Sequence, residues 1–208
     1  MFFDSRRSTV LAKNGMVATS QPLAAMAGLR TLIDGGNAVD AAIATAAVLN
    51  VVEPMSTGVG GDMFALVWNN DEKKVRAING SGRSAAASSL EELTSKGLDR
   101  MPDFGAHSIT VPGAVHGWET LIKAHGTMPL SEVLKPAIQY AEDGYPVSDV
   151  ISFQWSTEQK KLMQVPSGEE MLLNGIPPKQ GEVMRIPTLG RTLRAIAEGG
   201  AVAFYQGE

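Results

Sequence analysis

Arg83 is the residue whose surroundings most clearly suggest chemistry. It lies within residues 80–86, Gly-Ser-Gly-Arg-Ser-Ala-Ala, where the neighbouring side chains are small and no acidic residue is close in sequence. A planar guanidinium presented in this way can hold a carboxylate through two parallel hydrogen bonds. The sequence therefore predicts a carboxylate-binding residue at Arg83. The alternative interpretation is an exposed loop arginine that binds nothing.

A second local feature is the glycine-rich segment 56–62, Ser-Thr-Gly-Val-Gly-Gly-Asp. Glycines at this density let backbone N–H groups approach an anion closely. A phosphate-binding loop, however, follows a strand and precedes a helix, whereas here a predicted helix comes first and a predicted strand follows. We therefore interpret the segment as a tight passage from helix to strand, and nucleotide binding is the less favoured alternative.

Other residue types that often carry catalysis form no recognisable pattern. The three histidines, His107, His116 and His125, are spaced nine residues apart, which matches no helical pair of metal ligands. The absence of cysteine excludes a disulfide framework, a thiolate zinc site and a cysteine nucleophile within this chain. Neither a Gly-x-Ser-x-Gly elbow nor a Ser-x-x-Lys motif occurs. No catalytic residue, metal ligand or cofactor-binding residue is therefore predicted here.

Composition narrows the class of protein. The 208 residues include 18 Lys and Arg against 22 Asp and Glu, a net charge of −4, and 44% are hydrophobic. This balance argues against a nucleic-acid-binding face, and the apolar content is too high for a disordered chain. The longest apolar stretch, 38–52, is shorter than the ~20 residues of a membrane span. Because the N-terminus also lacks the charge order of a secretory signal, the sequence predicts a cytoplasmic protein without a membrane partner.

Hydrophobic periodicity and helix breakers predict the elements that would position these residues. Helices are predicted over residues 22–33, 38–52, 90–96, 114–124, 131–143, 147–163 and 188–198. Strands are predicted over residues 16–19, 63–68 and 74–78, of which the last two form a hairpin. Residues 165–185 are rich in Pro and Gly and are predicted to form a long loop. This order predicts mixed α and β layers of the α+β kind, since it fits neither alternating βαβ units nor a pure bundle.

The helix over residues 38–52 is apolar almost all round, which is typical of a helix buried between layers. Asn37 can cap it, with Asp40 near the positive end of the helix dipole. Gly35 and Gly36 are expected to end the preceding helix. Ser131 is the predicted cap of the helix over residues 131–143.

Beyond these local signals, several short blocks occur in a characteristic order. They are Gly-Met-Val-Ala-Thr at 15–19, Gly-Gly-Asn-Ala-Val-Asp-Ala-Ala at 35–42, Gly-Gly-Asp-Met-Phe at 60–64, Val-Pro-Gly-Ala-Val at 111–115, His-Gly-Thr-Met-Pro-Leu at 125–130, Ala-Glu-Asp-Gly-Tyr-Pro-Val at 141–147 and Phe-Tyr-Gln-Gly at 204–207. With these blocks the chain resembles the gamma-glutamyltranspeptidase (glutathione hydrolase) family from about Gly15 to its last residue.

The resemblance implies an N-terminal-nucleophile hydrolase fold, an αββα sandwich of two stacked sheets between helical layers. Residues 1–208 would form the N-terminal portion of one such domain, truncated at its C-terminus. Members are proenzymes that cut themselves, after which the freed N-terminal Thr attacks a γ-glutamyl amide such as glutathione and forms an acyl-enzyme. The implied partner is the missing C-terminal small-subunit region. No metal or organic cofactor is implied, and both homo- and hetero-oligomers remain open.

Two departures from the family pattern bear on function. The processing Thr and the other catalytic and substrate-binding residues of the small subunit lie downstream of anything in this chain, so the 208 residues alone are expected to be inactive. The family also places a carboxylate-binding arginine in an Asp-Phe-Arg-Glu-like string after the second strand, where this sequence has Ser81. Arg83 stands two residues later, and we transfer the role to it.

That shift keeps two alternatives open. One is a related amidase of the same fold with a cephalosporin-acylase-like specificity. The other is a non-catalytic remnant that serves only as a scaffold or binding chain.

Overall fold

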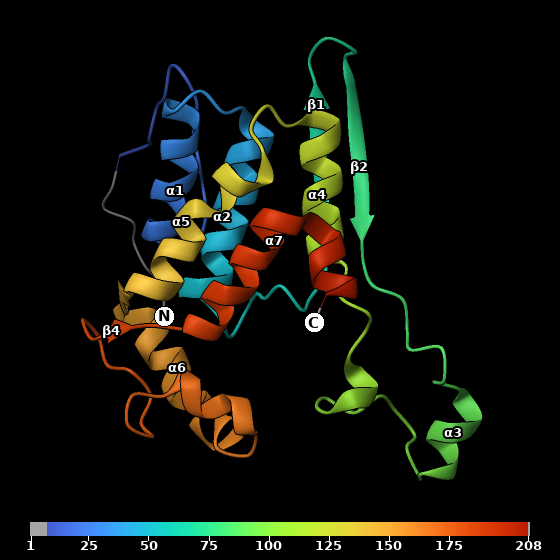
Figure 1. Cartoon of the computed structure of the whole chain (residues 1–208). Helices are drawn as coiled ribbons and strands as arrows, with labels where there is room; N and C mark the ends of the chain where they lie inside the picture. Colours follow the sequence, from blue (N-terminus) through green and yellow to red (C-terminus); the bar gives the residue numbers. More distant parts are fainter. Residues whose placement is uncertain (1–7, 208) are drawn as a thin grey trace.

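The computed structural model describes residues 8–207, in which a layer of helices lies beside a two-stranded sheet (Figure 1). The helices are α1 (Pro22–Ile33), α2 (Ala38–Val52), α3 (Leu90–Ser95), α4 (Ala114–His125), α5 (Leu130–Asp143), α6 (Asp149–Leu162) and α7 (Pro187–Gln206). The strands are β1 (Met63–Asn69), β2 (Lys74–Gly80), β3 (Tyr145–Pro146) and β4 (Val183–Met184). Helix α2 packs between α1 and α5, α7 packs on α5, and β1 and β2 lie against α4.

The predicted helix pair at the start of the chain is confirmed. α1 begins at Pro22, whose fixed φ suits the first helical position, and the chain leaves the helix through Gly35 at a φ of 97°. The two helices approach closely at Gly28, where an added Cβ would overlap the Thr45 hydroxyl and lie 3.0 Å from the Ala41 carbonyl. Glycine is therefore required at this crossing.

The N-terminus of α2 carries the predicted cap and a further connection. The Asn37 side chain accepts hydrogen bonds from the N–H groups of Val39 and Asp40, and Asp40 accepts one from the Asn37 N–H at 2.8 Å. The buried Asp40 carboxylate also accepts hydrogen bonds from the N–H groups of Thr127 and Met128. One carboxylate thus completes the helix cap and holds the connection between α4 and α5.

Burial of α2 is extensive but has one gap. Ala44, Ala47, Val48 and Val51 are fully inaccessible to solvent, and they form the centre of the core. On another side of the helix, Ala42 is exposed in the described residues. The prediction that α2 is buried is therefore confirmed for its core side, whereas the side that carries Ala42 borders an open cavity of about 660 Å³ along residues 14–19.

The two strands form the predicted antiparallel hairpin, in which Leu66 faces Ala77 and Trp68 faces Val75. Alternation along each strand gives the hairpin two faces. One face packs on α4 through Met63, as Gly117 shows: a side chain there would lie 2.5 Å from the Met63 sulfur. The other face is apolar and exposed.

Other expectations are wrong in detail. Residues 16–19 form no strand, because no described segment pairs with them. Pro129, rather than Ser131, is the residue before α5. The predicted loop 165–185 contains a 3₁₀ helix and β4, which pairs with β3. The last helix extends to Gln206, because a break at Gly200 redirects α7 without ending it.

The remaining predicted helices and the strand pair agree with the structure to within a few residues. Among the helices of residues 8–207, none combines the length and hydropathy that are needed to cross a bilayer.

Candidate functional site

Three segments that are distant in sequence meet where the hairpin joins α4. They are the end of the glycine-rich segment at Gly61 and Asp62, the end of β2 with the residues after it at 80–83, and the residues that lead into α4 and begin it at 110–114. The Gly61 carbonyl accepts hydrogen bonds from the N–H groups of Gly113 and Ala114, both at 3.0 Å. We call this meeting point the hairpin–α4 junction.

The junction is packed too tightly for side chains at two of its glycines. A Cβ on Gly82 would overlap the carbonyl of Val111, and a Cβ on Gly113 would overlap the carbonyl of Gly80. Real Cβ atoms do not approach backbone atoms so closely, and backbone cannot move aside as a flexible side chain can. From the sequence, the small residues around Arg83 were interpreted as a way to present its guanidinium. They also allow the backbone after β2 to contact the backbone that leads into α4.

Arg83 lies in the junction and is exposed. Its carbonyl accepts a hydrogen bond from the Val111 N–H at 2.9 Å, which fixes its backbone. Within residues 8–207 its guanidinium makes no ion pair, whereas Arg76 on the same hairpin is paired with Glu72. Arg83 thus combines a backbone held by a hydrogen bond with an exposed side chain, and its role in carboxylate binding stays a prediction.

Asp62 is a residue of the junction that the sequence analysis did not single out. Its Oδ1 accepts a hydrogen bond from the Gly82 N–H at 3.1 Å and one from the Thr110 hydroxyl at 3.3 Å. One carboxylate oxygen thus contacts both of the other segments of the junction. The available signal was an acidic residue directly after two glycines, but its partners lie 20 and 48 positions away.

Ser81, which the resemblance to the family aligns with a carboxylate-binding arginine, makes a local hydrogen bond. Its N–H donates a hydrogen bond to the Asn79 side chain at 2.9 Å, two residues before Arg83.

The glycine-rich segment connects α2 to β1, as interpreted from sequence. Next to it, a cavity of about 470 Å³ is lined in part by Asn50, Thr57, Asp62 and Trp118. The Asn50 amide donates to the Ala46 carbonyl at 2.9 Å and to the Thr57 hydroxyl at 3.2 Å. Its Oδ1 is buried and has no hydrogen-bond partner among the described residues. The cavity therefore adjoins the junction, and the Asn50 amide in its lining has both a hydrogen-bond donor and an acceptor.

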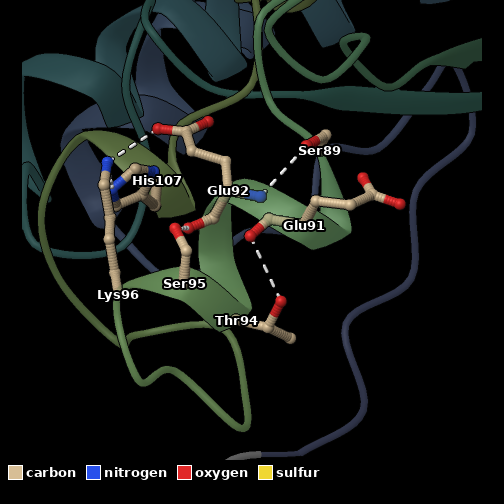
Figure 2. A network of polar contacts seen from close by, with 7 residues as sticks. All are labelled: Ser89, Glu91, Glu92, Thr94, Ser95, Lys96 and His107. Carbon is tan, nitrogen blue, oxygen red and sulfur yellow. Dashed lines mark hydrogen bonds and ion pairs between the residues drawn. The ribbon is translucent and has the colours of Figure 1, made fainter.

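The three histidines do not converge. Figure 2 shows His107 beside α3, with its Nε2 3.4 Å from the Lys96 ammonium. The same lysine bonds Glu92, and this hydrogen bond is the main reason that the pKa of Glu92 is lowered. His116 lies on α4, and His125 ends that helix. In residues 8–207, no group of three or more His, Asp and Glu side chains is arranged to hold a metal ion.

The far end of the described chain returns to the junction. The Tyr205 hydroxyl donates a hydrogen bond to the Pro112 carbonyl at 2.6 Å and accepts one from the His116 N–H at 3.2 Å. α7 can deliver Tyr205 there because of its break at Gly200, after which the Ala201 N–H bonds the Glu119 carboxylate of α4 at 3.4 Å. The last turn of α7 thus braces the segment that leads into α4.

Comparison with known proteins agrees with this architecture. The sequence model of the gamma-glutamyltranspeptidase family matches residues 24–208. The glutathione hydrolase-like YwrD proenzyme of Bacillus subtilis is 39% identical over 202 residues, which cover 96% of this chain and 38% of that protein. The chain therefore spans well under half the length of this relative.

Two solved structures superpose on the chain. Cephalosporin acylase from Bacillus halodurans does so with a TM-score of 0.92 at 45% identity, covering 99% of this chain and 39% of that one. Gamma-glutamyltranspeptidase from Helicobacter pylori does so with a TM-score of 0.90 at 28% identity, and the match covers 97% of this chain and 59% of that one. The described residues are accordingly a helix-rich part of the N-terminal-nucleophile hydrolase fold. With a family match over most of its length and relatives that agree with it, this chain belongs to the gamma-glutamyltranspeptidase family.

Proposed function

We propose that this chain is the N-terminal portion of one domain of a proenzyme that cleaves or transfers γ-glutamyl amides, glutathione among them. Membership of the family supports this function, as do curated relatives that are named glutathione hydrolase proenzymes. These relatives are much longer than the chain, which spans 36% and 38% of them. The nucleophilic Thr would lie in a region beyond the 208 residues.

In such an enzyme the hydroxyl of the freed N-terminal Thr attacks the amide carbonyl, and its own α-amine accepts the proton. The amine leaving group takes a proton as the C–N bond breaks, which leaves the γ-glutamyl group as an ester on the Thr. Water then yields the free acid, or an amino acid yields a new amide. Backbone N–H groups aimed at the carbonyl oxygen would stabilise the tetrahedral intermediate.

The part of this chemistry assigned to the present chain is recognition of the donor's α-carboxylate by Arg83. The single observation that carries the assignment is the exposed guanidinium, without an ion-pair partner in residues 8–207, on a backbone held in the hairpin–α4 junction. A bidentate contact would orient the γ-carbonyl as well as add affinity, because two parallel hydrogen bonds fix a planar group.

The same proposal names the small-subunit region as the partner of the exposed hairpin face. On that face Phe64, Leu66, Trp68 and Val75 are 69%, 78%, 57% and 58% exposed. Contiguous apolar side chains on a sheet are normally covered by another layer. A second sheet from the remaining region would cover them and complete the sandwich. Assembly into larger oligomers and a cytoplasmic location stay predictions from the sequence.

A second candidate is an amidase with a different acyl specificity. Its support is the 45% identity to the cephalosporin acylase, against 28% to the Helicobacter pylori transpeptidase. Arg83 stands two residues after the position expected for the family's arginine, so the bound carboxylate could belong to a differently shaped acyl group.

Steady-state kinetics of the complete, self-processed enzyme can test both candidates. The substrates are a γ-glutamyl anilide, the matching anilide that lacks the α-carboxylate, and a cephalosporin with an acidic acyl side chain. We expect Arg83→Ala to lower kcat/KM for the first by about 30- to 1,000-fold while sparing the second. Arg83→Lys should recover only part of the lost kcat/KM, because an ammonium group lacks the planar, two-pronged geometry of a guanidinium.

Arg191→Ala is the matched control, since Arg191 is also exposed but lies on α7. Equal losses on both anilides would show that Arg83 acts through folding. Faster turnover of the cephalosporin than of the γ-glutamyl anilide would favour the second candidate.

A further inference from the structure

We propose that Asp62 is a positioning residue for Arg83, and that its carboxylate sets how well a substrate carboxylate is recognised. The inference rests on the proposed function of Arg83. It concerns a residue that makes no contact with substrate itself and acts through the backbone of residues 82–83.

The backbone around Arg83 has few attachments. β2 ends at Gly80, so residues 82 and 83 lie beyond the strand ladder. Two hydrogen bonds hold them: the Val111 N–H to the Arg83 carbonyl at 2.9 Å, and the Gly82 N–H to Asp62 Oδ1 at 3.1 Å. Among the described residues, Asp62 is the one side chain that bonds this pair of residues.

The same oxygen also ties residues 82–83 to the segment that leads into α4. The Thr110 hydroxyl reaches Asp62 Oδ1 at 3.3 Å, one residue before the backbone that bonds Arg83. Gly82 meanwhile packs against the Val111 carbonyl without room for a Cβ. Asp62 therefore joins the beginning of β1 to the two segments that hold the Arg83 backbone.

Position matters because bidentate recognition tolerates little displacement, on the order of 0.5 Å. The arginine side chain is long and flexible, so the protein controls its reach mainly through the backbone. Asp62 makes no ion pair with Arg83. Its effect is therefore exerted through an acceptor oxygen rather than through its charge, and an asparagine in its place should preserve the effect.

The test uses the complete, self-processed enzyme with the two anilides, with and without the α-carboxylate. For Asp62→Ala we expect KM for the carboxylate-bearing anilide to rise about 10-fold, with kcat changed by less than about twofold, because the acceptor of the hydrogen bonds from the Gly82 N–H and the Thr110 hydroxyl is lost. The anilide without the carboxylate should be unaffected. Asp62→Asn should stay within about threefold of wild type, and Thr110→Val should shift KM in the same direction by less than Asp62→Ala.

Asp71→Ala is the control. It removes the same charge, but Asp71 lies in the turn at the other end of the same hairpin. An Asp62→Ala enzyme that loses equally on both anilides, or an Asp62→Asn enzyme as impaired as Asp62→Ala, would overturn the inference while Arg83→Ala still discriminates the two substrates. If Arg83→Ala does not discriminate them, the proposed role of Arg83 fails first, and the inference fails with it.

Discussion

The hydroxyl of Thr127 donates a hydrogen bond of 2.6 Å to Asp40 Oδ2, and the N–H of the same threonine lies 3.1 Å from each oxygen of that carboxylate. Asp40 is in the first turn of α2, whereas Thr127 belongs to the connection between α4 and α5. A fully buried carboxylate is thus compensated by donors from two distant parts of the chain.

This arrangement predicts a pH dependence of stability. Burial alone would raise the pKa of Asp40, but hydrogen bonds from Thr127, Asn37 and Met128 outweigh it, and the pKa is lowered. A carboxyl whose pKa falls on folding contributes stability above its unfolded value of about 3.9, and this contribution is lost as the pH drops through the folded value.

We expect Asp40→Asn to lower the free energy of unfolding at pH 7 by about 1.5–3 kcal/mol. The deficit should shrink below about pH 4, where protonation of the unfolded wild-type carboxyl begins to favour unfolding, and should vanish below the lowered pKa of the folded protein. Urea unfolding of the complete wild-type and Asp40→Asn proteins at pH 7 and pH 3 measures this difference in unfolding free energy. Asp34→Asn is the control, since Asp34 pairs with Arg30 at the surface. A deficit that is the same at both pH values would contradict the prediction.

Close backbone packing at the hairpin–α4 junction predicts different effects for two glycines. Gly113→Ala would force a Cβ into the Gly80 carbonyl, so we expect a loss of about 1–3 kcal/mol in unfolding free energy. Gly60→Ala should change it by less than about 0.5 kcal/mol, because no atom lies within 4 Å of the added Cβ. Denaturant melts of both variants provide the comparison, and similar losses would show that the junction can relax.

The uneven burial of α2 predicts a contrast along one helix. Ala44 is fully buried, so Ala44→Glu should cost several kcal/mol or abolish folding, because it buries an unpaired charge. Ala42 is exposed in the described residues, and Ala42→Glu should be tolerated when the 208-residue chain is expressed alone. If the rest of the proenzyme covers this side, the same change will destabilise the complete protein. Soluble yield and melting temperature of both forms measure this difference.

The chain by itself should be inactive and prone to associate. No Thr in it stands in the family's processing context, and without a freed α-amine beside a hydroxyl the nucleophile lacks its base. Its mass should stay constant over days, and γ-glutamyl anilide should not be hydrolysed above the rate without protein. Leu66→Lys should reduce the associated fraction in light scattering, since Leu66 is on the exposed hairpin face. A discrete internal cleavage would disprove the inactivity.

Sequence patterns predicted the elements whose ends carry local signals. Pro22, Asn37 and the Gly35–Gly36 pair bracket α1 and α2, and both helices have the predicted bounds. The hairpin was equally readable, because alternating residues flank a polar turn.

What the sequence could not show depends on partners far along the chain. A strand at 16–19 was predicted from β-forming residues, but a strand also needs a neighbour, and the described chain offers none. The pairing of Tyr145 with Met184 was missed for the opposite reason: each segment is too short to signal a strand alone. At the candidate site, isolation among small residues singles out Arg83 in the sequence as a prediction, whereas the contacts of Asp62 are made with residues 20 and 48 positions away.

The hydrogen bond from Tyr205 to Pro112, which spans 93 positions, has a kinetic consequence. Contacts between segments so distant close large loops, and their entropic cost must be met before the contact stabilises anything. On the ribosome, Gly61, Arg83 and Pro112 all emerge well before Tyr205 does. We therefore expect the hairpin to form early and the segment leading into α4 to be braced late in folding, after the last turn of α7 has been synthesised.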